Sequence, residues 1–232
     1  MRKKGRIFKF ALKYNNKYNM NHETKTDKPF KILSIDGGGI RGIMPARILY
    51  EMEGELERIG SHETRVGDYF DLICGTSTGG IIAIGLALGM PAKEILKLYK
   101  ENASYIFPPK SNPLIQFIKG KPLYNPDYLY KKLYDTFSYY TGKRMPRIGD
   151  CKTRILIPVY NAKNGTIHVY KTPHHIELKR DYLMPAHDVA LSTASAPVYF
   201  PPHSFKYECP QTNIPFDYLH NIDGGVFANN PA

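Results

Sequence analysis

One stretch of the sequence joins a short apolar run to a glycine-rich turn, and it reads FDLICGTSTGG over residues 70–80. Residues 75–79 fit the pattern G-x-S-x-G, in which a nucleophilic serine stands on a tight turn between a strand and a helix. The flanking residues agree with that context, since residues 70–74 read as a buried strand and residues 81–88 as an apolar helix. The pattern therefore predicts that Ser77 is a nucleophile and leaves open which group accepts its proton.

A second unit of the same kind precedes this stretch. Residues 31–35 form an apolar run, a glycine loop follows over residues 36–42, and apolar residues recur at helical spacing over residues 45–59. Two strand–turn–helix units in succession favour an α/β fold, with a parallel sheet covered by helices.

The rest of the sequence predicts further helices, an antiparallel strand pair, a loop and a final strand. The paired strands, over residues 154–160 and 166–170, are joined through Asn164-Gly165, a dipeptide typical of tight hairpin turns. Helices are expected over residues 91–102, 127–139 and 186–195, a surface loop over residues 108–126 and the last strand over residues 218–222.

The net charge of +11 is concentrated at the N-terminus, because residues 1–28 carry nine lysines or arginines and only two acids. The remaining residues are mildly basic, so we expect no nucleic-acid partner. A helix over residues 7–18 would place three lysines opposite an apolar face, and such a helix could bind a membrane surface. The alternative is a disordered tail. We therefore expect a basic tail over residues 1–28, unless Met20 is the true start, and one domain over residues 29–232.

Apolar stretches and cysteines indicate the compartment. The longest apolar stretch of the tail is interrupted by Lys9, unlike that of a signal peptide, and no segment is long enough to span a bilayer. Three widely spaced cysteines, Cys74, Cys151 and Cys209, favour neither a disulfide framework nor a zinc site. We expect a cytoplasmic protein that is peripheral at a membrane if the tail binds one.

The glycine loop fits two kinds of site. Gly37, Gly39 and Gly42 satisfy the dinucleotide fingerprint G-x-G-x-x-G, but the next strand does not end in the acid that would hold a ribose. Consecutive glycine N–H groups at a helix start can instead converge on an oxyanion, with Arg41 adding a positive charge beside them. An oxyanion hole would complement a nucleophile at the neighbouring strand end.

Two candidates remain for the base. Asp188 with His203 has the order of a hydrolase triad, Ser, Asp and then His, but neither stands at a recognisable strand end. Asp223 directly follows the expected last strand, and the glycines after it leave its carboxylate room to approach another loop.

Three motifs in this order resemble those of the patatin-like phospholipase family: DGGGIRG over residues 36–42, GTSTG over residues 75–79 and DGG over residues 223–225. The segment ASAPVYFPP, residues 194–202, also resembles the part of that family that precedes its catalytic Asp. The resemblance covers about residues 30–232. It implies a three-layer α/β/α fold with a mostly parallel central sheet, a Ser–Asp dyad in place of a triad, and hydrolysis of fatty acyl esters of lipids without metal or cofactor.

The resemblance assigns roles to individual residues. Ser77 would be the nucleophile, Asp223 the base, and the N–H groups of the glycine loop the oxyanion hole. The loop glycines are Gly37, Gly38 and Gly39, the supporting residues Arg41 and Thr78, and the remaining motif glycines Gly75, Gly79, Gly224 and Gly225.

We thus expect a phospholipase A-type enzyme whose partners are an acyl-lipid substrate and a membrane surface. The alternative is a degenerate, non-catalytic member that binds a membrane or an anionic ligand through the glycine loop. Residues 229–232 read as the start of a helix with Pro231 in its first turn, so we also expect the domain to be truncated before a covering helix.

Overall fold

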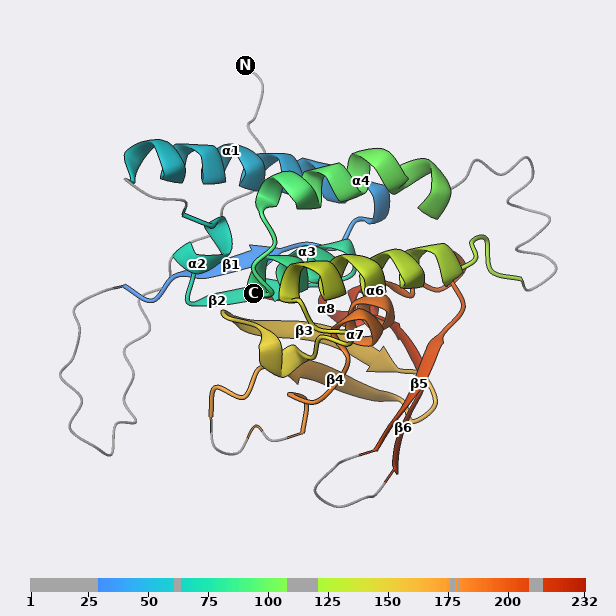
Figure 1. Cartoon of the computed structure of the whole chain (residues 1–232). Coiled ribbons are helices and arrows are strands. Elements are labelled where there is room, and N and C mark those ends of the chain that lie inside the picture. The colour runs from blue at the N-terminus through green and yellow to red at the C-terminus, as the bar shows by residue number, and fades with distance from the viewer. Residues whose placement is uncertain (1–28, 61–63, 108–120, 176–177, 179, 209–214) are drawn as a thin grey trace.

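A computed structural model describes residues 29–60, 64–107, 121–175, 178, 180–208 and 215–232, and its helices and strands form an α/β architecture, as predicted (Figure 1). The basic segment 1–28 lies outside these residues, so the tail and the domain boundary after it stay predictions. Most of the expected surface loop and Cys209 also lie outside them.

Six strands form one mixed sheet, in the order β1-β2-β3-β6-β5, with β4 paired to β3. The first three strands run parallel, whereas β4 and β6 run antiparallel to β3, and β5 runs antiparallel to β6. The sequence predicted a mostly parallel sheet, but only β1, β2 and β3 are parallel to one another. Short connections join β3 to β4 and β5 to β6, and strands joined by such short connections must be antiparallel. The strands are β1 (Ile32–Ile35), β2 (Leu72–Gly75), β3 (Arg154–Asn161), β4 (Thr166–Lys171), β5 (His203–Glu208) and β6 (Pro215–Asp223).

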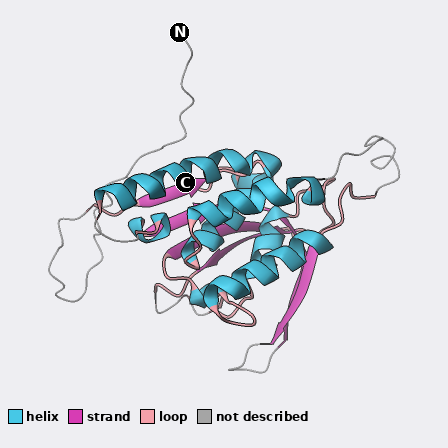
Figure 2. Cartoon of the chain, turned by 45° about the horizontal axis from the view of Figure 1, so that its top comes forward, coloured by secondary structure: helices cyan, strands magenta, loops and turns pink. Residues whose placement is uncertain are grey.

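The long helices form two layers on the sheet. Helix α3 packs on β2 and β3, α7 packs on β3, β5 and β6, and α1, α4 and α6 lie further out (Figure 2). The helices are α1 (Ile43–Ile59), α2 (Val66–Tyr69), α3 (Thr78–Ala87), α4 (Ala92–Ile106), α6 (Asp127–Thr141), α7 (Ala186–Ala194) and α8 (Gly225–Ala228), with short 3₁₀ helices η1 (Gly39–Gly42) and η2 (Ile148–Asp150). None of these described helices is both long and apolar enough to cross a membrane.

The two faces of the sheet differ in burial. Ile73, Ile155 and Ile157 are completely buried in the core with α3 and α7. Leu72 and Leu156 alternate with them along the strands, point to the opposite face and are half-buried. Since β1, β2 and β3 follow one another in one direction across the sheet, right-handed crossovers bring their helices to the same face.

Most expected elements are present with boundaries shifted by a few residues. The hairpin of β3 and β4 is confirmed, but its loop spans residues 162–165 and is longer than a two-residue turn, and within it only Gly165 has a left-handed φ, of 66°. Strand β5 was not predicted, although residues 204–208 alternate polar with aromatic side chains, because this short run directly follows a proline-rich segment.

A buried acidic side chain, Glu53, fixes the starts of two helices. It is 4% exposed, and its carboxylate accepts the N–H groups of Val66 at 2.9 Å and Ala92 at 2.8 Å. These residues begin α2 and α4, whose N-terminal ends favour negative charge. Burial raises the pKa of Glu53, while the two backbone hydrogen bonds and Arg65 act to lower it.

We expect Glu53→Ala to lower the free energy of unfolding by about 2–4 kcal/mol, because two charge-assisted hydrogen bonds are lost and two buried N–H groups lose their partner. Urea denaturation at neutral pH measures this change. Glu51→Ala, which removes only an exposed ion pair with Arg47 one turn away, should change stability by less than about 1 kcal/mol. Equal effects of the two substitutions would contradict the role of Glu53.

Candidate active site

Ser77 lies on the turn between β2 and α3, where the sequence placed it. Its φ of 57° falls in the left-handed region that residues with a side chain rarely adopt, and the residue is 8% exposed. The turn closes tightly: a Cβ atom on Gly79 would collide with the carbonyl oxygen of Ile35, and one on Gly75 with that of Gly79. These glycines therefore allow Ser77 to stand at the positive N-terminal end of α3.

Asp223 reaches Ser77 from a distant part of the sequence. It is the last residue of β6 and pairs with Val159 of β3 inside the sheet. Its carboxyl group accepts the Gly225 N–H at 2.7 Å and lies close enough to the Ser77 side chain for Ser77 to lower its pKa. Burial raises the pKa of this carboxyl group above its ordinary value, although Ser77 and the Gly225 N–H act to lower it.

Close packing against β3 explains why the residue after Asp223 is a glycine. A Cβ atom on Gly224 would collide with the carbonyl oxygen of Pro158, so only glycine allows the chain to pass β3 at this distance. The close passage holds Asp223 against the sheet with its carboxyl group directed to Ser77.

The glycine loop borders the site, but its three N–H groups are not equivalent. Gly38 and Gly39 line a cavity together with Ser77. The N–H of Gly37 instead donates to the carbonyl oxygen of Asn229 at 3.1 Å. The donors that remain beside Ser77 are therefore those of Gly38 and Gly39.

The cavity beside Ser77 has a volume of about 350 Å³, which lies in the range of small-molecule sites. Arg41 and Thr78 line it near the loop, and Arg41 is exposed while Thr78 is buried. The rest of the lining is mainly aliphatic or aromatic and includes Ile81, Leu98, Ile106, Phe107, Leu129 and Phe200. A cavity of this kind accepts an apolar chain.

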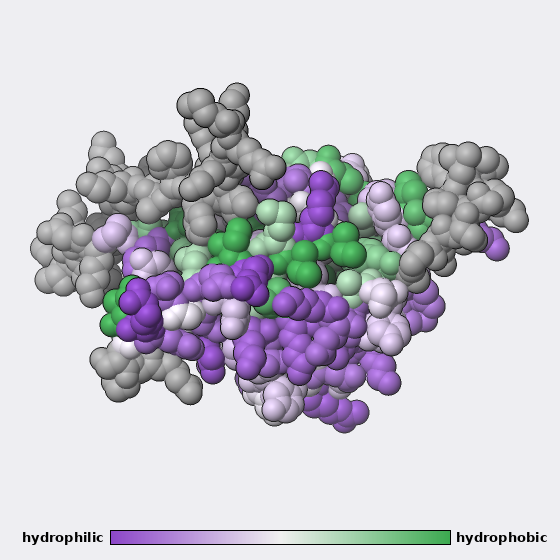
Figure 3. All heavy atoms as spheres, turned by 90° about the horizontal axis from the view of Figure 1, so that it is seen from above, coloured by the Kyte–Doolittle hydropathy of each residue, from purple (hydrophilic) through white to green (hydrophobic). Residues whose placement is uncertain are grey.

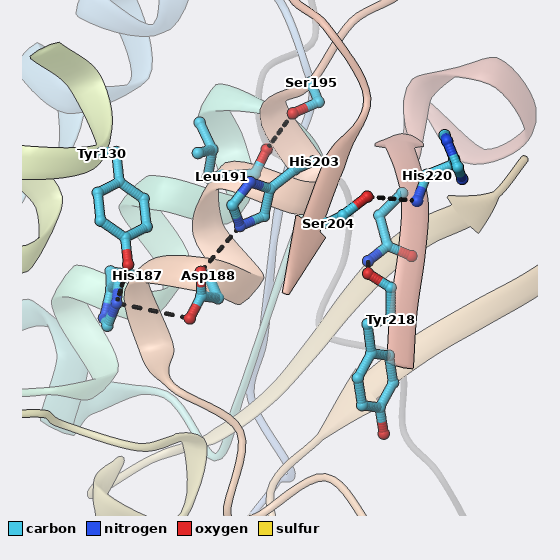
Figure 4. Close-up of polar contacts among 10 residues, drawn as sticks. Tyr130, His187, Asp188, Leu191, Ser195, His203, Ser204, Tyr218 and His220 are labelled. Atoms are coloured by element: carbon cyan, nitrogen blue, oxygen red, sulfur yellow. Dashed lines mark hydrogen bonds and ion pairs between the residues drawn. The ribbon is translucent and has the colours of Figure 1, made fainter. Parts of the chain in front are cut away.

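The histidine alternative forms a separate pair. His203 Nε2 lies 2.8 Å from Asp188 Oδ1, and the neighbouring His187 lies 3.1 Å from the hydroxyl of Tyr130 (Figure 4). These residues hold α7 to β5 and α6, whereas the carboxyl group whose pKa Ser77 lowers is that of Asp223. The arrangement therefore favours Asp223 over the histidine pair as the proton acceptor.

Two residues that hold the turn were not singled out from the sequence. The Tyr99 hydroxyl donates to the carbonyl oxygen of Thr78 at 3.0 Å, and the Thr193 hydroxyl accepts the N–H of Ser77 at 3.1 Å. Tyr99 offered one signal, since it is a polar aromatic residue on the apolar face of an expected helix. Thr193 offered none, because buried hydroxyls are common in helices of small residues.

No group of three or more His, Cys, Asp or Glu side chains that could hold a metal ion occurs among the described residues. Cys74 and Cys151 are both free, and burial raises the pKa of the Cys74 thiol to about 11, which leaves it uncharged and unreactive.

The turn around Ser77 has the strand–turn–helix form that the pattern G-x-S-x-G adopts in α/β proteins. Within that class, residues 33–232 match the patatin-like phospholipase family, and the chain belongs to this family. The resemblance noted in the sequence is thus confirmed.

Two curated relatives and one solved structure illustrate the similarity. The chain is 39% identical over 211 residues to the "cGAMP-activated phospholipase" of Vibrio cholerae serotype O1, and the aligned region covers 87% of this chain and 55% of the relative. It is 38% identical over 221 residues to "Patatin-like protein 2" of Arabidopsis thaliana, and this aligned region covers 87% of this chain and 50% of the relative. The structure of VipD from Legionella pneumophila aligns with a TM-score of 0.48 at 13% identity, over 85% of this chain and 46% of its own. The chain thus spans about half the length of the curated relatives that it matches.

We expect Asp223→Asn to remove a pH-dependent loss of stability. A carboxyl group whose pKa is raised by folding contributes stability below its unfolded pKa of about 3.9, and this contribution is lost as pH rises through the folded pKa. Relative to the wild type, the variant should therefore become more stable as pH increases from about 4 to about 7. Urea denaturation at both pH values measures the difference, and a relative loss of stability over this range would contradict the raised pKa.

Proposed function

We propose that the chain is a phospholipase A-type acyl hydrolase in which Ser77 is the nucleophile and Asp223 the general base. The observation that carries this proposal is that Ser77, on the turn after β2, and the buried Asp223 carboxyl group, at the end of β6, meet closely enough for Ser77 to lower the pKa of Asp223. The apolar cavity beside Ser77 and the membership of the patatin-like phospholipase family support an acyl lipid as substrate.

In the first half of the reaction, the Asp223 carboxylate accepts the proton of Ser77 as Oγ attacks the ester carbonyl carbon. The oxyanion of the tetrahedral intermediate is stabilised by the N–H groups of Gly38 and Gly39 and by the N-terminal end of α3. The leaving alcohol, a lysophospholipid, takes the proton from Asp223 as the ester bond breaks. Because burial raises the pKa of Asp223, this carboxylate is a stronger base than a solvated one.

In the second half, Asp223 accepts a proton from a water molecule that attacks the acyl-Ser77 ester. The new tetrahedral intermediate collapses, Ser77 Oγ recovers the proton held by Asp223, and the fatty acid leaves. The same carboxyl group thus acts as base and then as acid in each half-reaction. All groups used in these steps belong to this chain.

The mouth of the cavity supports the proposal that the substrate is met at a lipid surface. Ile40 and Tyr199 both line the cavity and are 51% and 50% exposed. Met44, one turn beyond Ile40, is 57% exposed. On the face that carries α1 and α4, hydrophobic residues gather in a band between hydrophilic regions (Figure 3). Apolar side chains at the mouth would be removed from water when the protein rests on a membrane.

We expect Ser77→Ala and Asp223→Asn each to lower kcat for phospholipid hydrolysis by a factor of about 10³ or more, because the first removes the nucleophile and the second the base. Fatty acid release from mixed vesicles measures this loss, and a fluorophosphonate probe should label Ser77 of the wild type alone. Wild-type rates in either folded variant would exclude the dyad. A wild-type protein that neither hydrolyses esters nor reacts with the probe would instead favour the non-catalytic alternative.

We expect Met44→Asp to lower hydrolysis of vesicle phospholipid about 10-fold, because a charge replaces apolar area that contacts the lipid surface. Hydrolysis of a water-soluble short-chain ester should stay unchanged, since this substrate does not require the surface. Ile59→Asp is the matched control: Ile59 is 77% exposed at the far end of α1, about 22 Å from Met44. Equal losses for the two variants, or an equal loss on the soluble ester, would contradict a lipid-facing mouth.

A further inference from the structure

The last turn of α7 contacts both residues of the proposed dyad through hydrogen bonds to their backbones. Thr193 Oγ1 accepts the N–H of Ser77 at 3.1 Å. Two residues later, the carbonyl oxygen of Ser195 accepts the N–H of Asp223 at 3.0 Å. One short segment therefore fixes the positions of two groups that lie far apart in the sequence.

The Thr193 hydroxyl makes a second bond that extends this link to the sheet. It donates to the carbonyl oxygen of Pro158 at 2.7 Å, so both its donor and its acceptor capacity are used. Pro158 precedes Val159, the β3 residue paired with Asp223, and its carbonyl oxygen is the group that Gly224 passes closely. A single hydroxyl thus joins the turn of Ser77 to the strand beside Asp223.

Burial and backbone strain make this hydroxyl important for geometry. Thr193 is 0% exposed, so it cannot touch a substrate. Ser77 holds a left-handed φ of 57°, and a non-glycine residue keeps such a conformation only where its surroundings fix it. The bond to Thr193 fixes the peptide group between Thr76 and Ser77, and it also occupies the Ser77 N–H.

Helix α7 is itself held at its other end. Asp188 in its first turn is bonded to His203 of β5 at 2.8 Å, and His187 contacts the Tyr130 hydroxyl of α6 at 3.1 Å (Figure 4). The helix is therefore anchored at its start to β5 and α6, and its last turn presents Thr193 from a fixed position.

We propose that Thr193 is the positioning residue for Ser77: its hydroxyl holds the nucleophile turn in register with the strand of Asp223. This role rests on the proposed hydrolase function. Without the hydroxyl, Ser77 Oγ would lose its alignment with the Asp223 carboxylate and with the Gly38 and Gly39 N–H groups. The rate of attack would then fall while lipid binding in the cavity stayed the same.

The experiment compares variants at Thr193 with a control one residue away. Thr193→Val keeps the shape of the side chain and removes the hydroxyl, so kcat should fall about 10- to 100-fold at unchanged KM. Thr193→Ser keeps the hydroxyl and should retain kcat within about threefold. Ser192→Ala should leave kcat unchanged, because the Ser192 hydroxyl is fully buried but finds no hydrogen-bond partner among the described residues. Should Thr193→Val not fold, Thr193→Ser and Thr193→Ala form the replacement pair, since both lack the methyl group and only the second lacks the hydroxyl.

A second readout does not depend on turnover. Hydrogen exchange of the Ser77 amide, followed by NMR, should be protected in the wild type, in Thr193→Ser and in Ser192→Ala, and accelerated in Thr193→Val. Wild-type kcat in Thr193→Val, or an equal loss in Thr193→Ser, would overturn the positioning role while wild-type hydrolysis still supports the dyad. An unchanged amide exchange rate in Thr193→Val would also overturn it. A wild type that does not hydrolyse esters would refute the proposed function itself, and the positioning role with it.

Discussion

The close approach of the turn after β2 to the end of β1 is the constraint on which the site depends. Because Gly79 lies directly against the carbonyl oxygen of Ile35, no side chain fits there, and the first turn of α3 is brought against the sheet. Ser77 on this turn has a left-handed φ of 57°, which costs about 1–3 kcal/mol. The hydrogen bond from its N–H to Thr193 and the packing of α3 in the core offset this cost. The position of the serine is thus a property of the whole helical layer.

The burial of Asp223 has two opposite effects. Desolvation of its carboxylate reduces the stability of the folded state at neutral pH, while it also makes the group a stronger base. The nearby Ser77 side chain and the hydrogen bond from the Gly225 N–H limit the first effect without removing the second. A site with this balance sacrifices some stability for the chemistry that it supports.

The spacing of apolar residues and the positions of glycines were enough to predict the elements that form from neighbouring residues in the sequence. Helical spacing and apolar runs placed α1, α3, β1 and β2, and the glycines around Ser77 pointed to the turn. Asp223 was selected because it follows the expected last strand and precedes two glycines, and the family resemblance gave it the role of base.

Features that depend on contacts between distant segments could not be predicted in this way. Strand β6 comes last in the sequence yet lies between β3 and β5, and no periodicity within its own residues specifies those neighbours. The hydrogen bond from the Gly37 N–H to Asn229 could not be predicted either, because these residues are far apart in the sequence. Glu53 looks in the sequence like an ordinary charged residue of a helix, whereas its buried carboxylate accepts the N–H groups at the starts of two other helices.

The position of β6 also sets the order in which the molecule is completed during synthesis. The ribosome adds about 5–20 residues per second, so the segment with Ser77 emerges roughly 10 s before the strand that carries Asp223. Until that strand inserts between β3 and β5, the growing chain exposes a serine without its carboxylate partner. The two residues of the proposed dyad therefore come together only when the sheet itself is assembled.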